Sequence, residues 1–132
     1  MLARTPALEA DRDAAFRRTV ERLDTLGKMD FTVPVSLKAT LRGYQVDGYQ
    51  WLGSLEHLSL GGILADDMGL GKTLQMIAHI LARVEAGDTK PTLVVCPASL
   101  VYNWTAELER FAPSLDCLLY TSPSPRDRQK SR

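Results

Sequence analysis

The stretch GGILADDMGLGKTLQ, residues 61–75, constrains the fold more than any other part of the sequence. A run of small and apolar residues gives way to glycines, then to Lys72 and Thr73, and then to a helical pattern of apolar residues. A strand, a glycine-rich turn and a helix in this order gather main-chain N–H groups that have no intrahelical partner. Because the helix dipole adds positive potential at the same point, the stretch predicts an anion site, for phosphate above all.

The residue types in the turn specify the anion further. Gly69 and Gly71 allow a tight turn and a close approach of phosphate, since no Cβ stands in the way. Lys72 is predicted to place its ammonium on the β- and γ-phosphates, and Thr73 to offer a hydroxyl to Mg²⁺. At about 4 Å and moderate screening, one such ion pair contributes on the order of 4 kcal/mol before desolvation. The strict pattern G-x-x-x-x-G-K-[ST] fails at Asp66, and the alternative is a glycine-rich turn that only caps an ordinary helix.

Hydrophobic periodicity organises the rest of the chain into helices and strands. Helices are predicted over residues 6–26, 41–58 and 71–84, with a fourth marked by Leu100, Trp104, Leu108 and Phe111. GGILA (61–65) and TLVVCP (92–97) are predicted as buried strands, because continuous apolar runs are typical of parallel sheets. The alternation of strand and helix predicts an α/β fold with right-handed crossovers and a parallel sheet. The predicted inner faces are Leu41, Tyr44, Gly48, Leu52 and Leu55 on the second helix, and Leu74, Ile77, Ile80, Leu81 and Val84 on the third.

Composition narrows the class of protein. The chain has 132 residues, 45% of them hydrophobic, and a net charge of zero, so any contact with nucleic acid must come from a local basic patch. A basic face of the first helix, with Arg12, Arg17, Arg18 and Arg22, is expected to be solvated. Cys96 and Cys117 lack the spacing of a metal site and are expected to be free thiols. With no secretory signal core and no apolar run of membrane-spanning length, we expect an intracellular protein without a membrane partner.

Three motifs resemble those of one known family. ILADDMGLGKTLQ resembles the first helicase motif of the Swi/Snf-type ATPases, a branch of helicase superfamily two, in which an acidic pair before M-G-L-G-K-T is usual. LRGYQVDGYQWL is similar to the leading glutamine motif of that family, although Gly43 stands where proline is frequent. LVVCPASLVYNWTAELERF is similar to the motif that follows. The resemblance implies an incomplete RecA-like P-loop NTPase lobe with parallel strands, preceded by an N-terminal helix.

The resemblance also implies roles for individual residues. Gln45 would read the adenine edge, while Pro97, Ala98 and Ser99 would lie beside one strand of duplex DNA. An equally weighted interpretation of Ser99 is that it caps its helix. Trp51 and Trp104 are expected to be packing anchors, and His57 and His79 are given no chemistry. The implied nucleotide-binding set is Gln45, Asp66, Asp67, Met68, Gly69, Leu70, Gly71, Lys72 and Thr73, with Lys72 and Thr73 acting on the reaction and Thr73 reaching Mg²⁺ through ATP.

Family members use ATP and Mg²⁺ to translocate on double-stranded DNA and to shift or strip bound proteins. Phosphoryl transfer also needs an acidic motif for Mg²⁺ and water and an arginine from a second lobe. Neither is found in the sequence, so weak nucleotide binding without turnover is expected. The alternatives are an RNA helicase fragment of the same superfamily and a non-catalytic binding fragment. A bacterial-type, cytoplasmic and nucleoid-associated member is favoured, with the nucleus as the alternative for a eukaryotic one.

Three segments are predicted along the chain: a helical lead-in (1–30), the partial ATP-binding lobe (31–116) and a non-native tail (117–132). The tail begins CLLYTSPSPRD, which resembles a sequencing-library adapter translated in frame. The natural chain is therefore expected to depart near Asp116. The alternative is a genuine basic linker rich in serine and proline.

Overall fold

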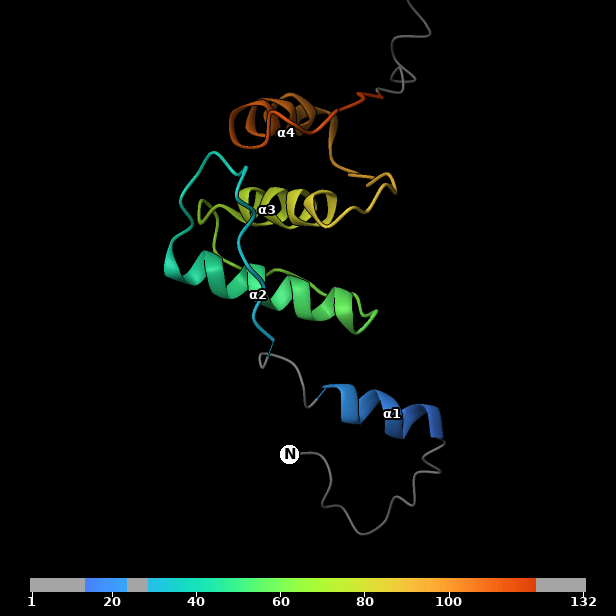
Figure 1. Ribbon diagram of the computed structural model, residues 1–132. Coiled ribbons are helices and arrows are strands. Elements are labelled where there is room, and N and C mark those ends of the chain that lie inside the picture. The colour runs from blue at the N-terminus through green and yellow to red at the C-terminus, as the bar shows by residue number, and fades with distance from the viewer. Residues whose placement is uncertain (1–13, 24–28, 121–132) are drawn as a thin grey trace, which may run out of the picture.

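The computed structural model describes residues 14–23 and 29–120, and within these ranges it consists of helices joined by extended segments (Figure 1). The helices are α1 (Ala14–Leu23), α2 (Gly43–His57), α3 (Lys72–Glu85) and α4 (Ala98–Phe111). Figure 1 shows α2, α3 and α4 stacked in this order. Each helix falls at a predicted position, and residues 6–13 and 24–26 of the first predicted helix lie outside the described residues.

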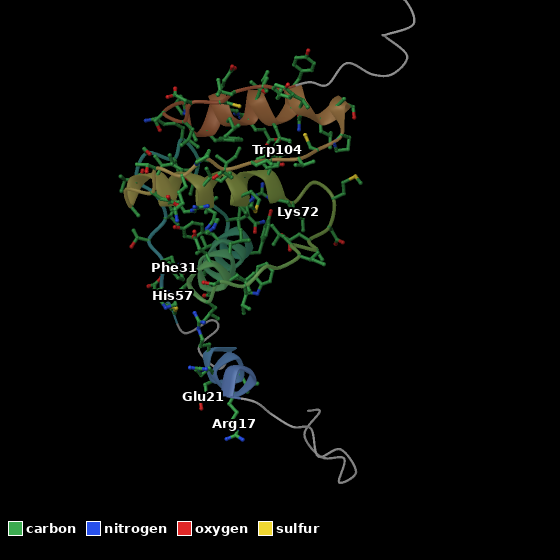
Figure 2. All side chains as sticks on the ribbon, turned by 90° about the vertical axis from the view of Figure 1, so that its right-hand side faces the viewer. Arg17, Glu21, Phe31, His57, Lys72 and Trp104 are labelled. Carbon is green, nitrogen blue, oxygen red and sulfur yellow. The ribbon has the colours of Figure 1, made fainter. Side chains whose placement is uncertain are left out.

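The core is built around α3. Ile77, Ala78 and Leu81 on this helix are at most 1% exposed. Tyr49 of α2 packs against them from one side, and Trp104 of α4 from another, as Figure 2 shows for Trp104 between α4 and α3. Burying a large aliphatic side chain contributes roughly 1.5–3 kcal/mol. The packing therefore fixes α3 between its two neighbours and confirms Trp104 as a packing anchor.

The buried faces of α2 and α3 agree with the predicted ones at Leu55, Ile77 and Leu81 and differ from them elsewhere. On α2 the buried positions include Gln45, Tyr49 and Gly53, whereas the predicted Tyr44 is 38% exposed. Gly53 is buried because the ring of Phe31 lies where a Cβ would be, at 2.8 Å. On α3 the predicted Val84 is 47% exposed and Gln75 is fully buried. Apolar periodicity located both helices and part of their inner faces correctly, but it did not predict the buried polar side chains Gln45 and Gln75.

The two predicted strands are not formed in the described part of the chain. GGILA and TLVVCP are extended but make no ladder, and Ile63, Leu93 and Val95 are each more than 80% exposed. A strand exists only through hydrogen bonds to a neighbouring strand, and no backbone hydrogen bond of the described residues joins these two segments. The prediction of two buried strands was therefore wrong for this structure, and no parallel sheet is formed among the described residues.

A crossing segment, residues 29–41, ties the three stacked helices together (Figure 1). Gln50 of α2 accepts a hydrogen bond from the Phe31 N–H at 2.6 Å and donates one to the Phe31 carbonyl at 2.7 Å. The Tyr49 hydroxyl donates to the Thr32 carbonyl at 2.7 Å. Further along, the Lys38 N–H donates to the carbonyl of Phe111, at the end of α4, at 2.8 Å. The segment is thus hydrogen-bonded both to α2 and to the end of α4.

Glu85, at the end of α3, anchors the middle of the crossing segment. Its carboxylate accepts from the Ser36 hydroxyl, from the Ser36 N–H at 3.0 Å and from the Val35 N–H at 3.2 Å. The bonds from the Ser36 side chain and then from its N–H lower the pKa of Glu85 below its ordinary value. A lowered folded-state pKa means that the stabilisation is present above the unfolded pKa and is lost as the pH falls through the folded one.

We expect Glu85→Gln to lower the thermal midpoint near pH 7 by removing this charged acceptor. The cost is at most about 1 kcal/mol because the carboxylate is exposed to solvent. The difference from wild type should shrink as the pH is lowered below about 4, which thermal melting across a pH series measures. Glu109→Gln, on the exposed side of α4, is the control. An equal effect of both substitutions, or a difference independent of pH, would contradict the role of Glu85.

Candidate nucleotide-binding site

The first turn of α3 carries Lys72 and Thr73, and the loop before it turns on two glycines. Gly69 has φ 86° and Gly71, the N-cap of α3, has φ 78°. Both values lie in the left-handed region, which costs a residue with a side chain on the order of 1–2 kcal/mol. The sequence expectation that glycines make this turn possible is therefore borne out in the backbone, and the phosphate loop is defined here as residues 66–71.

Main-chain donors converge at the end of the phosphate loop. The first helical hydrogen bond of α3 runs from the Gln75 N–H to the Gly71 carbonyl at 3.2 Å. The N–H groups of Lys72, Thr73 and Leu74 precede it and have no intrahelical partner, as at any helix start. Gly71 cannot cap them because it has no side chain. The positive end of the helix dipole is thus directed at this point.

Lys72 is folded over the phosphate loop. Its ammonium donates to the main-chain carbonyl of Asp66 at 2.5 Å and to that of Asp67 at 2.9 Å. Met68, at the tip of the loop, is 98% exposed. Figure 2 places Lys72 at the end of α3 where the loop returns. The loop, the ammonium and the start of α3 therefore form one exposed, positively polarised site.

Gln45 binds the far end of the phosphate loop. It lies in the first turn of α2 and is 6% exposed. Its amide oxygen accepts from the Arg42 N–H at 2.9 Å, and its amide nitrogen donates to the Leu70 carbonyl at 3.0 Å. The structure thus brings Gln45 to the loop. The reading of adenine stays a prediction, because both ends of the amide are engaged within the chain.

Gln75 is the residue of this site that the sequence reasoning missed. It is fully buried, and its amide nitrogen donates to a carboxylate oxygen of Asp66 at 2.9 Å. The signal that could have found it is its place three residues before Ala78, on the inner face of α3. A polar residue on that face needs a partner, and the acceptor that Gln75 meets is the carboxylate of Asp66 at the start of the loop.

Pro97, Ala98 and Ser99 lie together at the start of α4, and all three are exposed. The N-cap is Pro97, and this end of the helix has no side-chain cap hydrogen bond. The interpretation of Ser99 as a cap was therefore wrong. The DNA contact predicted for these residues stays a prediction, and their exposure is compatible with it.

His79 and Arg83 of α3 form structural contacts with α2. His79 Nε2 lies 3.3 Å from Glu56 of α2, and Arg83 Nε lies 2.8 Å from the same carboxylate. Burial lowers the pKa of His79, and the neighbouring Glu56 opposes that shift. Both Cys96 and Cys117 are free. Among the described residues, no group of three or more His, Cys, Asp and Glu could hold a metal, and no helix is long and apolar enough to cross a bilayer.

Comparison with known families identifies the class to which this loop and helix arrangement belongs. The model of the SNF2-related domain matches residues 44–131, more than half of the chain. The chain belongs to the SNF2-related family, which confirms the resemblance to Swi/Snf-type ATPases. The match continues past Asp116, so it does not set residues 117–132 apart, and a non-native tail stays a prediction.

Particular relatives agree with this assignment. TATA-binding protein-associated factor mot1 of Aspergillus fumigatus is 41% identical over 91% of this chain and 7% of its own length. Helicase SWR1 of Eremothecium gossypii is 45% identical over 83% of this chain and 7% of its own. The Sulfolobus solfataricus SWI2/SNF2 ATPase core in complex with dsDNA has a TM-score of 0.60 and 46% identity, over 64% of this chain and 19% of that one. The chain thus spans a small part of the proteins it matches.

The comparisons do not support two finer expectations, the parallel sheet and the bacterial, nucleoid-associated localisation. The structural neighbour supports the ATPase-core class of fold, while the parallel sheet is not formed among the described residues. Relatives come from fungi and also from Bacillus subtilis, where one is 41% identical over 88% of this chain. They give no support to the preference for a bacterial, nucleoid-associated protein.

Substitutions of the two loop glycines, Gly69 and Gly71, should lower stability to different extents. Gly71→Ala combines a left-handed φ with a Cβ only 2.5 Å from the Gln45 amide nitrogen, whereas a Cβ at Gly69 has nothing within 4 Å. We expect Gly69→Ala to lower the free energy of unfolding by about 1 kcal/mol and Gly71→Ala to lower it further. Denaturant melts measure both.

Gly43→Ala is the matched control, because it lies on a helix and its Cβ would also meet nothing within 4 Å. It should be neutral or slightly stabilising. Equal stability of the Gly43 and Gly71 variants would show that the loop does not need its left-handed glycine.

Proposed function

We propose that this chain is the ATP-binding portion of a Swi/Snf-type, DNA-translocating ATPase that remodels DNA-bound proteins. The observation that carries the proposal is the ammonium of Lys72 held over a glycine-hinged loop at the start of α3. Membership of the SNF2-related family supports it. Because the chain spans so little of its relatives, the translocation and the remodelling are properties proposed for the whole protein.

The residues present fit a nucleoside triphosphate. A Cβ at Gly69 would meet open space, which indicates that the loop leaves room beside its backbone for phosphate oxygens. The N–H groups at the start of α3 and the Lys72 ammonium supply donors of the right sign. A bound phosphate would replace the two loop carbonyls as the partner of Lys72. The proposed set is the one predicted from sequence: Gln45, Asp66, Asp67, Met68, Gly69, Leu70, Gly71, Lys72 and Thr73.

Thr73, next to Lys72 on α3, is proposed to hold Mg²⁺ that arrives with ATP. When bound, the ion would neutralise charge on the β- and γ-phosphates. The role of this chain is to bind and orient the triphosphate through Lys72 and the loop. We propose weak ATP binding and no substantial turnover by the chain alone, since neither a second acidic motif nor an arginine from a second lobe is found in its sequence.

DNA binding is proposed at the start of α4. Pro97, Ala98 and Ser99 are exposed there, next to backbone N–H groups that can contact a phosphate. The similar ATPase core from Sulfolobus was solved in complex with dsDNA, which favours duplex DNA as the nucleic acid. An RNA helicase fragment is the second candidate, and a non-catalytic binding fragment the third. The fungal relatives favour a nucleus over a bacterial cytoplasm as the compartment.

Mg-ATP should bind the 132-residue chain in a manner that depends on Lys72. We expect Lys72→Ala to weaken binding at least about tenfold, because it removes a full charge from the phosphate site. Isothermal titration calorimetry measures the affinity. Lys90→Ala removes an exposed lysine after the end of α3 and serves as the control. Binding that survives Lys72→Ala, or that Lys90→Ala weakens equally, would exclude this loop as the nucleotide site.

Nucleic-acid preference separates the candidate functions. We expect duplex DNA to bind more tightly than single-stranded RNA of the same length, and the affinity to fall with rising salt. Fluorescence anisotropy of labelled duplex and RNA measures both, with Ser99→Ala as the variant and Thr105→Ala, further along α4, as its control. A preference for RNA would favour the RNA helicase, and phosphate release stimulated by DNA would contradict the proposed lack of turnover.

A further inference from the structure

We propose that Gln75 is a positioning residue of the phosphate loop, which holds the carboxylate of Asp66 away from Lys72. Gln75 lies in the first turn of α3 and is fully buried. Its amide nitrogen donates to Asp66 Oδ2 at 2.9 Å. Among the described residues this is the only hydrogen bond of its side chain, since the amide oxygen is buried without a partner.

The burial of Gln75 costs free energy that an apolar side chain of the same length would not. A buried amide is unfavourable unless its groups are hydrogen-bonded, and half of this amide is not. Packing alone would therefore favour methionine or leucine at this position. The bond to Asp66 is what the glutamine adds, so its role is directed at the loop.

Holding Asp66 at its carboxylate also fixes its main chain. The carbonyl of the same residue accepts the Lys72 ammonium at 2.5 Å. No ion pair between Lys72 and a carboxylate is formed among the described residues, although two aspartates begin the loop. Lys72 is thus bound by neutral carbonyls, which a phosphate can replace more easily than it could a carboxylate. Gln75 maintains this arrangement by engaging the carboxylate of Asp66.

A second buried glutamine holds the other end of the loop. Gln45 donates to the Leu70 carbonyl, so the loop is fixed at Asp66 from α3 and at Leu70 from α2. Gly48 of α2 makes room for the side chain of Gln75, because a Cβ there would lie 1.9 Å from the Gln75 amide oxygen. The loop geometry therefore depends on the packing of α2 against α3.

The first test is amide hydrogen exchange of the full 132-residue chain with Gln75→Met, which keeps length and burial but removes the donor. Exchange of residues 66–71 should rise several-fold, while that of residues 77–81 in the middle of α3 stays unchanged. Gln50→Met is the matched control, because it removes a glutamine that holds Phe31 and not the loop. Unchanged loop exchange in Gln75→Met, or an equal rise in Gln50→Met, would overturn the proposal.

The second test rests on the proposed nucleotide binding and uses Mg-ATP titration. Gln75→Met should weaken binding about tenfold, as expected when a free Asp66 carboxylate pairs with Lys72. Asp66→Ala in the same chain should restore most of the affinity, because Asp66 serves the proposed site through its main chain and not its carboxylate, whereas Asp67→Ala should restore little. A purely structural role of Gln75 would give no such rescue. Failure of the rescue overturns this inference alone, whereas wild-type binding that is insensitive to Lys72→Ala overturns the proposed function and leaves the exchange result standing.

Discussion

The site depends on the packing of α3, which must be buried in its middle and open where it begins. Ile77 and Leu81 supply the burial, and Lys72 begins the helix at the surface of the phosphate loop. The change from interior to surface takes place within two turns, so polar side chains must lie at its edge. Gln45 and Gln75 occupy that edge, and both direct an amide donor at the loop. Buried polar groups are nearly always hydrogen-bonded, and here that requirement couples the core to the site.

The helices were predictable from sequence because each carries its own apolar pattern. Some of their buried positions were not, because Gly53 and Gln75 are buried for reasons that lie on other segments, the ring of Phe31 and the carboxylate of Asp66. The predictions of the two strands were wrong for a related reason. GGILA and TLVVCP have the composition of interior strands, but a strand is a property of two segments, and the described residues offer neither of them a partner.

The chemistry of the loop was predictable because it is local. Glycines at positive φ, a lysine and a helix start are contiguous in sequence, and the structure places them together. What sequence could not provide is the direction of each polar side chain. Gln45 was expected to face a base, and its amide is engaged by Arg42 and Leu70. The motif assigned Gln45 to the nucleotide-binding set, while tertiary contacts determine what the amide binds.

Two aspartates at the start of a phosphate loop pose an electrostatic difficulty that the structure resolves. A carboxylate near a triphosphate repels it, and a carboxylate near Lys72 neutralises the charge that attracts it. Asp66 avoids both outcomes by turning its carboxylate to Gln75 and its carbonyl to Lys72. Asp66 thus accepts from Gln75 through its carboxylate and from Lys72 through its main-chain carbonyl. An acid at position 66 is compatible with anion binding because its charge is directed inward, and the inward partner is a neutral amide that the sequence places three residues after the lysine.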